Sequence, residues 1–373
     1  MLPHNPIPKT RQNIIVVNWH ANYIYPFESM PEHYTSINKE VISSMYNIKG
    51  NQAQKIDSVT FSELNMLEND IEEILRNNVE MLCDEEESML IVGRQVRNEE
   101  NGRSDLTAVD SDGNIVLIEI KRDKRDIEGR KEAFEFQAIR YAASYATIGT
   151  VDDLVKKVYV PYIEKYRDEF ELGELTSYEV GIRKLNEFLS VNDVVKNFNQ
   201  KQRIILVASD FDSQTLSAVA WLNSNHVDMS CYRLIPYKIN DDVYLNIKRL
   251  LPITPYDDYY VNLLDKSDHT TLKSKRQITR RSLPKIDKMM EWGVVKAGDI
   301  IQAKGRDDEA ELLANGNVLV DHAELSMQTW LKNLYGWSSV QTYVFAIHKE
   351  SGKSLSQIRE EYMQENLVTG DEN

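Results

Sequence analysis

Cysteine is scarce in this chain: its 373 residues include only two, Cys83 and Cys231. Two thiols cannot build a disulfide framework, nor can they supply the ligands of a structural zinc site. The seven histidines are scattered and show no metal-ligand spacing. Any bound metal should therefore be a hard cation held by oxygen atoms, and the chain should belong to a reducing, cytoplasmic compartment.

Long apolar runs are also missing. No stretch reaches the roughly 18 unbroken apolar residues of a membrane helix, and the first residues lack the apolar segment of a signal peptide. We therefore expect no membrane association. Because the chain is 42% hydrophobic and 28% charged, its composition is that of a globular protein. At this length, two or three domains are expected rather than one core.

Positive charge is in deficit, with a formal net charge of −15. A protein that coats DNA without specificity is usually basic, because neutralisation of phosphates dominates that kind of affinity. The acidity argues against such a role. It does not exclude an enzyme with one basic groove, since basic residues are concentrated in segments 121–125 and 273–281.

Hydrophobic periodicity predicts an α/β domain over residues 61–255, in which a strand–helix–strand unit completes the sheet begun by the hairpin. The expected elements are a helix from Ser62 to Leu82, an extended segment over 89–97, a hairpin over 102–121 with its turn at Asp112 and Gly113, a helix over 130–148, a buried strand over 203–208, a helix that starts near Asp210, and a strand over 229–235.

The remaining sequence divides into three parts. Residues 1–60 form an N-terminal extension without an assignable role, and residues 256–286 form a basic linker. Residues 287–373 predict a small α+β domain. Its expected elements are strands near 299–303 and 309–313, a turn at 315–317, and helices over 326–334 and 354–363.

The charged residues that could bind a metal and catalyse a reaction are concentrated in the predicted hairpin. Asp105 lies on its first strand, and Glu119 and Lys121 lie on its second. Because side chains alternate along a strand, Glu119 and Lys121 point to the same face, while Ile120 points to the other. Two carboxylates and an ammonium group at one edge of a sheet can hold Mg²⁺ or Mn²⁺ and direct a water at a phosphodiester.

Further residues extend this predicted site. Glu68 on the preceding helix is a candidate third carboxylate, although other acidic residues compete for the role. These are Glu63, Glu72 and Glu73. Gln137 and Tyr141 lie one helical turn apart, so both can hold a phosphate backbone or orient Lys121.

The order of these motifs resembles a known family. The matching segments are Gly102-Arg103-Ser104-Asp105, Ile118-Glu119-Ile120-Lys121 and Gln137-Ala138-Ile139-Arg140-Tyr141. They are similar to PD-(D/E)XK nucleases of the RecB-like group, particularly NucS-type DNA endonucleases. The resemblance covers roughly residues 60–150 and extends toward residue 255 through the strand at residues 205–211. It implies a restriction-endonuclease-like core, a mixed sheet flanked by helices, that acts on DNA with a divalent metal. One departure is Ser104, which stands where the family motif has proline.

The C-terminal segment resembles a RAMA domain, a module linked to restriction systems and implied to recognise modified DNA. The resemblance rests on segments 298–301, 310–316, 325–330 and 334–339. Aromatic side chains stack on bases, and the candidates here are Trp330, Tyr335, Trp337 and Tyr343. We expect Trp330 to fill the core and Trp337 to take a functional position.

The sequence therefore predicts a metal-dependent DNA endonuclease, restriction- or defence-like, whose C-terminal module selects the substrate. The candidate DNA contacts are Arg103, Arg122, Lys124, Arg125, Lys275, Arg276, Arg280, Arg281 and Trp337. The alternative is a catalytically silent nuclease fold that binds DNA or docks on a partner. A nuclease acting on RNA rests only on the versatility of the fold. Because cutting both strands requires two active sites, we expect a homodimer.

Overall fold

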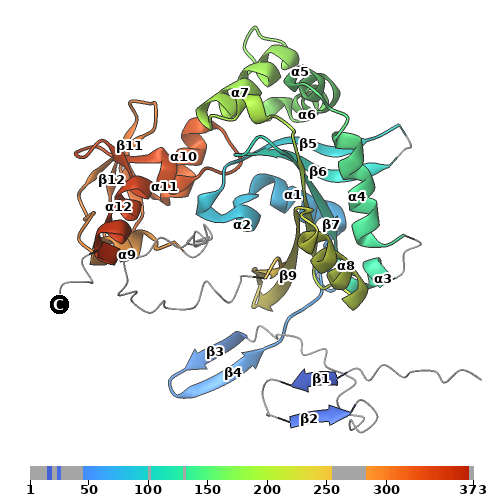
Figure 1. Ribbon diagram of the computed structural model, residues 1–373. Helices are drawn as coiled ribbons and strands as arrows, with labels where there is room; N and C mark the ends of the chain where they lie inside the picture. The colour runs from blue at the N-terminus through green and yellow to red at the C-terminus, as the bar shows by residue number, and fades with distance from the viewer. Residues whose placement is uncertain are drawn as a thin grey trace, which may run out of the picture. The chain divides into compact units, whose positions relative to one another are not determined.

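The computed structural model describes residues 15–18, 23–26, 45–99, 102–128, 132–253 and 283–368. The chain divides into two units, Met1–Asp57 and Ser58–Asn373. Two antiparallel hairpins are described in the first unit (Figure 1). Their strands are β1 (Ile15–Asn18), β2 (Tyr23–Pro26), β3 (Met45–Lys49) and β4 (Gln52–Ile56).

The second unit is built on a six-stranded mixed sheet with the strand order β10-β9-β8-β7-β6-β5. The strands are β5 (Met89–Arg97), β6 (Arg103–Asp110), β7 (Ile115–Lys121), β8 (Gln202–Ala208), β9 (Met229–Ile239) and β10 (Asp242–Leu251). Strand β8 runs parallel to both β7 and β9, while the other neighbours pair antiparallel. The predicted hairpin, buried strand and mixed sheet are confirmed.

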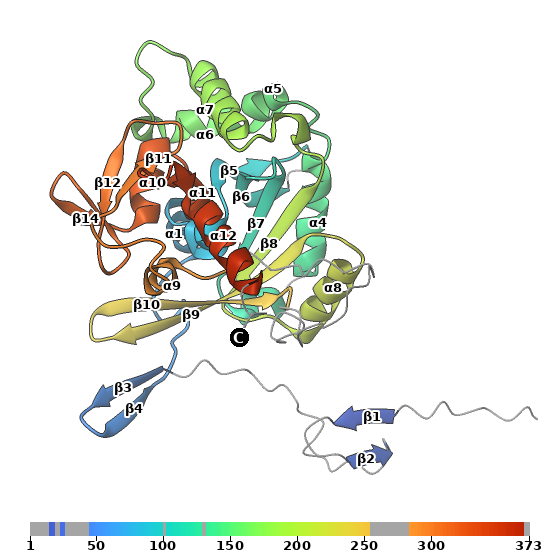
Figure 2. The ribbon, with the colours of Figure 1, turned by 60° about the vertical axis from the view of Figure 1, so that its left-hand side comes forward.

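Helices flank this sheet on both faces (Figure 2). Helix α1 (Glu68–Asn77) packs against β6 and β7, and α4 (Phe134–Tyr145) packs against β6, β7 and β8 from the other face. The other helices of this part are α2 (Glu80–Cys83), α3 (Lys124–Glu128), α5 (Val151–Leu154), the π-helical turn η4 (Val155–Tyr159), α6 (Val160–Lys165), α7 (Ser177–Val191) and α8 (Ser213–Ser224).

The C-terminal region forms a second, antiparallel sheet with the order β14-β13-β12-β11-β15-β16. Its strands are β11 (Ile300–Ala303), β12 (Glu309–Leu312), β13 (Val318–Val320), β14 (Ala323–Leu325), β15 (Ala346–His348) and β16 (Lys353–Ser354). Its helices are α9 (Ile286–Glu291), α10 (Met327–Tyr335), α11 (Thr342–Phe345) and α12 (Leu355–Val368). The expected α+β character of this region is confirmed.

The first core helix starts later than the periodicity predicts. Helix α1 begins at Glu68 rather than near Ser62, because the Leu67 N–H donates to the Asp70 carboxylate at 2.7 Å and caps the helix there. The Ser62 hydroxyl instead donates to Asp123. The predicted start was therefore wrong by about one and a half turns, and α1 carries fewer of the expected acidic residues.

The C-terminal region contacts the core at the start of β5. Met89 and Ser339 form an antiparallel bridge, with reciprocal N–H···O distances of 3.1 and 2.9 Å. The Ile91 N–H donates to the Ser338 hydroxyl at 3.0 Å. Arg359, with 1% of its surface exposed, pairs with Glu86 at 2.8 Å. None of the helices in the described ranges has the length and apolarity needed to span a bilayer.

Candidate functional site

Asp105 and Glu119 lie side by side on adjacent strands. The antiparallel register pairs Leu106 of β6 with Ile118 of β7, which brings the next residues together. The Asp105 N–H donates to Glu119 Oε1 at 3.3 Å, and the Ile120 N–H donates to Asp105 Oδ2 at 2.7 Å. Both carboxylates are buried, at 4% and 0% exposure. They lie where the alternation of the hairpin predicts them.

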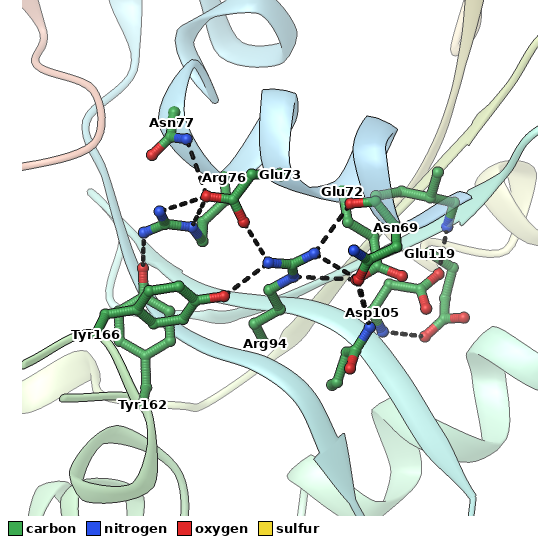
Figure 3. A network of polar contacts seen from close by, with 12 residues as sticks. Asn69, Glu72, Glu73, Arg76, Asn77, Arg94, Asp105, Glu119, Tyr162 and Tyr166 are labelled. Atoms are coloured by element: carbon green, nitrogen blue, oxygen red, sulfur yellow. Dashed lines mark hydrogen bonds and ion pairs between the residues drawn. The ribbon is translucent and has the colours of Figure 1, made fainter. Parts of the chain in front are cut away.

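A carboxylate triad forms where α1 crosses β6. Glu68, Glu72 and Asp105 each offer an oxygen, and these oxygens lie within 4.8 Å of one another. Glu68 and Glu72 are four residues apart on α1, so they share the face that packs on the sheet. Glu119 lies beside this triad rather than in it (Figure 3). Sequence reasoning named Glu68 but left Glu72 as one of several competing acids.

Lys121 places a buried ammonium group against the triad. Its Nζ atom is 3.0 Å from Glu68 Oε1 and 3.9 Å from Asp105 Oδ2, and it donates to the Ile120 carbonyl at 2.5 Å. The side chain is 2% exposed and lies 5.5 Å from the centre of the Phe134 ring. One lysine thus offsets part of the negative charge that the carboxylates concentrate here.

The protonation of Asp105 reflects this environment. Burial raises the pKa of Asp105 to about 7, because the charged form loses its hydration. The Lys121 charge and the Ile120 N–H oppose that rise, whereas the negative charges of Glu72 and Glu68 add to it. Asp105 therefore changes its protonation at a much higher pH than an exposed aspartate does.

A polar network holds Glu72 in place. Arg94 on β5 donates from Nε to Glu72 Oε2 at 3.1 Å (Figure 3). Gln95 donates to the same oxygen at 2.9 Å. Arg94 also contacts Glu73 and donates to the Tyr166 hydroxyl at 2.7 Å. This guanidinium joins α1, β5 and the helices beyond them, so Glu72 has little freedom to leave the triad.

Two members of the triad, Glu68 and Glu72, line an open hollow of about 610 Å³. Besides Glu68 and Glu72, three arginines line it: Arg103, Arg122 and Arg125. All three were predicted DNA contacts. Arg122 pairs with Asp126 at 3.2 Å, and Lys124, a fourth predicted contact, lies 3.6 Å from Asp210. The hollow therefore combines acidic groups with a basic rim.

Gln137 and Tyr141 support the strand that carries Asp105. Gln137 Nε2 donates to the Tyr141 hydroxyl at 3.2 Å, and the hydroxyl accepts the Arg103 N–H at 3.1 Å. Gly102 allows this approach, because a Cβ atom there would lie 2.5 Å from the Tyr141 ring. The pair was predicted to hold phosphate or orient Lys121, and the structure places it at the start of β6.

The predicted base-stacking aromatics are buried. Trp330, Tyr335, Trp337 and Tyr343 are 2–5% exposed. The Trp337 ring centre lies 4.8 Å from that of Phe188 on α7 and 5.3 Å from that of Phe345. Trp330 fills the core as expected. In this arrangement Trp337 also packs between protein side chains, instead of facing a surface open to bases.

Four predicted DNA contacts, Lys275, Arg276, Arg280 and Arg281, lie outside the described residues.

Comparisons with protein-family models, with curated proteins and with solved structures found no match. The interpretation of the site therefore rests on its geometry.

Proposed function

We propose that this chain is a metal-dependent nuclease that hydrolyses phosphodiester bonds in DNA. One observation carries the proposal: three carboxylates converge within 4.8 Å, with the Lys121 ammonium 3.0 Å from one of them. The hollow that Glu68 and Glu72 line also has three arginines in its wall. Negative groups that hold a cation, next to positive groups that attract phosphate, are the components of phosphodiester hydrolysis.

The donor atoms fit a hard divalent cation. Glu68, Glu72 and Asp105 offer only carboxylate oxygens, which Mg²⁺ and Mn²⁺ prefer over nitrogen or sulfur. Burial is the main cause of the raised pKa of Asp105, and the nearby negative charges of Glu72 and Glu68 add to it. When bound, such an ion would supply an acidified water and charge compensation for the phosphate.

The protein groups would divide the remaining work. Lys121 holds a point charge at the carboxylates, where it can steady an attacking water or a phosphate oxygen. Arg103, Arg122 and Arg125 line the hollow and would draw the DNA backbone toward the site. Glu119 accepts the Asp105 N–H and so keeps the two strands in register at the site.

The proposal includes membership of the PD-(D/E)XK nucleases, in the RecB-like or NucS-type group. It is supported by the order of Asp105, the Glu119-Ile120-Lys121 strand and the Gln137–Tyr141 helix on a mixed sheet. We further propose that the C-terminal region is RAMA-like and selects DNA by base modification, in a restriction- or defence-like role. Because Trp337 is buried, any base reading would use other residues of this region.

Plasmid cleavage tests the nuclease. Purified protein is incubated with adenine-methylated and unmethylated plasmid in Mg²⁺ or Mn²⁺. Asp105→Ala and Lys121→Ala should each lower the cleavage rate by roughly 100-fold or more, the size of effect seen when a group that stabilises transition-state charge is removed. Asp168→Ala and Lys196→Ala, at exposed positions outside both the site and the C-terminal region, serve as matched controls.

The outcomes separate the two functional hypotheses. Cleavage that survives both site variants would exclude these residues from catalysis. DNA binding without cleavage in either metal would instead favour a silent DNA-binding protein. A difference between the two plasmids would support selection by modification.

A further inference from the structure

A second hollow, of about 340 Å³, is lined by Gln95 and its neighbours on β5 and by residues of η4 and α6. Five of its lining residues are cationic and none is acidic: Arg94, Arg97, Arg103, Lys157 and Lys165. We call this the cationic hollow. In a chain with a net charge of −15, such a concentration of one sign points to an anionic ligand.

Most of this charge is available to a ligand. Arg94 is committed to Glu72 and Glu73, and Lys157 lies 3.8 Å from Asp153 at an exposed position. Within the described ranges, no ion pair involves Arg97, Arg103 or Lys165. Val96, Val158 and Pro161 form apolar parts of the wall, which strengthen electrostatic attraction by limiting water.

The cationic hollow adjoins the hollow that Glu68 and Glu72 line. Gln95 and Arg103 line both. Arg94 pairs with Leu106 and Val96 with Ser104, so Gln95 lies opposite Asp105 in the β5–β6 register. Gln95 has a φ of +54°, in the left-handed region, and its amide is held by Asn69 and Glu72. Backbone strain of this kind concentrates at functional sites.

We propose that the cationic hollow binds a phosphate of the same polynucleotide strand, beyond the bond that lies at the carboxylate triad. This inference rests on the proposed nuclease function and makes it more specific. The substrate would be a strand whose backbone continues past the cleaved bond, rather than an isolated phosphodiester. Arg103, shared by the two hollows, would contact the backbone between the two phosphates.

Binding of a labelled oligonucleotide tests this directly. Fluorescence anisotropy is measured in EDTA over a range of salt concentrations, for wild type and a Lys157→Ala/Lys165→Ala double variant. The double variant should bind more weakly, and the slope of log affinity against log salt should fall by about one for each lysine that contacts a phosphate. Both side chains are exposed, so thermal unfolding should be unchanged.

Lys156→Ala is the matched control. Lys156 is the exposed neighbour of Lys157, pairs with Asp152 at 2.7 Å and does not line the hollow. If the double variant binds with the same affinity and salt slope as Lys156→Ala, the proposal is overturned, even where the protein cleaves DNA.

A second measurement uses two cleavage substrates. The ratio of kcat/KM for the oligonucleotide to that for bis(p-nitrophenyl) phosphate should fall in the double variant and hold in Lys156→Ala. An unchanged ratio would contradict a phosphate site beyond the cleaved bond. If wild type cleaves neither substrate but the double variant loses oligonucleotide affinity, phosphate binding in the cationic hollow is supported and the nuclease proposal fails.

Discussion

Asp105 links the stability of the fold to pH. Its pKa is raised from 3.8 to about 7, chiefly by burial. Between these values the folded protein keeps a proton that the unfolded chain releases, so the free energy of unfolding falls as pH rises through this window. The stabilisation that comes from the proton on folded Asp105 is fully present below about pH 4 and is lost above about pH 7.

Asp105→Asn should remove this pH dependence, because an amide does not ionise. In metal-free buffer at about pH 8, we predict that the variant is more stable than wild type by on the order of 1–3 kcal/mol, and that the advantage disappears near pH 4. Urea denaturation at both pH values measures it. Asp307→Asn, at an exposed position, should show no such trend. An Asn variant destabilised at pH 8 would contradict the assignment.

Glu72 is the member of the triad that the sequence does not single out. Glu72→Gln keeps the shape of the side chain but removes its charge, so Mn²⁺ affinity measured by calorimetry should fall at least about tenfold. Glu63→Gln is the control, since Glu63 is exposed and accepts hydrogen bonds from Thr60. Equal affinities in the two variants would remove Glu72 from the proposed metal site.

At the scale of elements, local patterns predicted the strands well. The hairpin was recognised because alternation and the Asp112-Gly113 turn are both contained within a few residues. The start of α1 was predicted too early, because Leu64 and Leu67 continue the helical periodicity. A long-range contact from Ser62 to Asp123 instead holds the segment before α1 in a turn.

The same distinction applies to the candidate site. The proximity of Asp105 and Glu119 follows from strand pairing alone. Choosing Glu72 among neighbouring acids requires knowing which face of α1 meets β6, and that is decided by tertiary packing. Trp337 was expected on a loop with a function, but its burial depends on Phe188, which is far away in the sequence.

Close packing of β5 on η4 gives a prediction for this pair of elements. A Cβ atom at Gly93 would lie 2.6 Å from Val158 Cγ1 and 2.8 Å from Val96 Cγ2. Gly93→Ala should therefore destabilise the protein by about 1–3 kcal/mol in urea denaturation. Gly149→Ala meets no atom within 4 Å and should be close to neutral. A neutral Gly93 variant would mean that η4 moves away at little cost.

For the whole second unit, Arg359 connects the C-terminal region to the core. Only 1% of its surface is exposed. It pairs with Glu86 and donates to the Pro284 carbonyl at 3.1 Å. Arg359→Leu leaves Glu86 without this buried partner, so we predict a loss of about 3–5 kcal/mol. Calorimetry should show one transition at lower Tm. Lys349→Ala, in an exposed pair, should change little.

Two separate transitions, with only one shifted by Arg359→Leu, would contradict this picture. They would mean that the C-terminal region unfolds independently of the sheet that carries the carboxylate triad.

The bridge between Met89 and Ser339 has a consequence for solubility. Strand β5 is an edge of the six-stranded sheet, and an uncovered edge offers its backbone groups to any other extended chain. Ser338 and Ser339 occupy the first of these groups, next to the apolar run Met89–Val92. A nascent chain lacks this cover until Ser338 and Ser339 have been synthesised. The C-terminal region therefore covers part of an edge that could otherwise pair with another extended chain and cause aggregation.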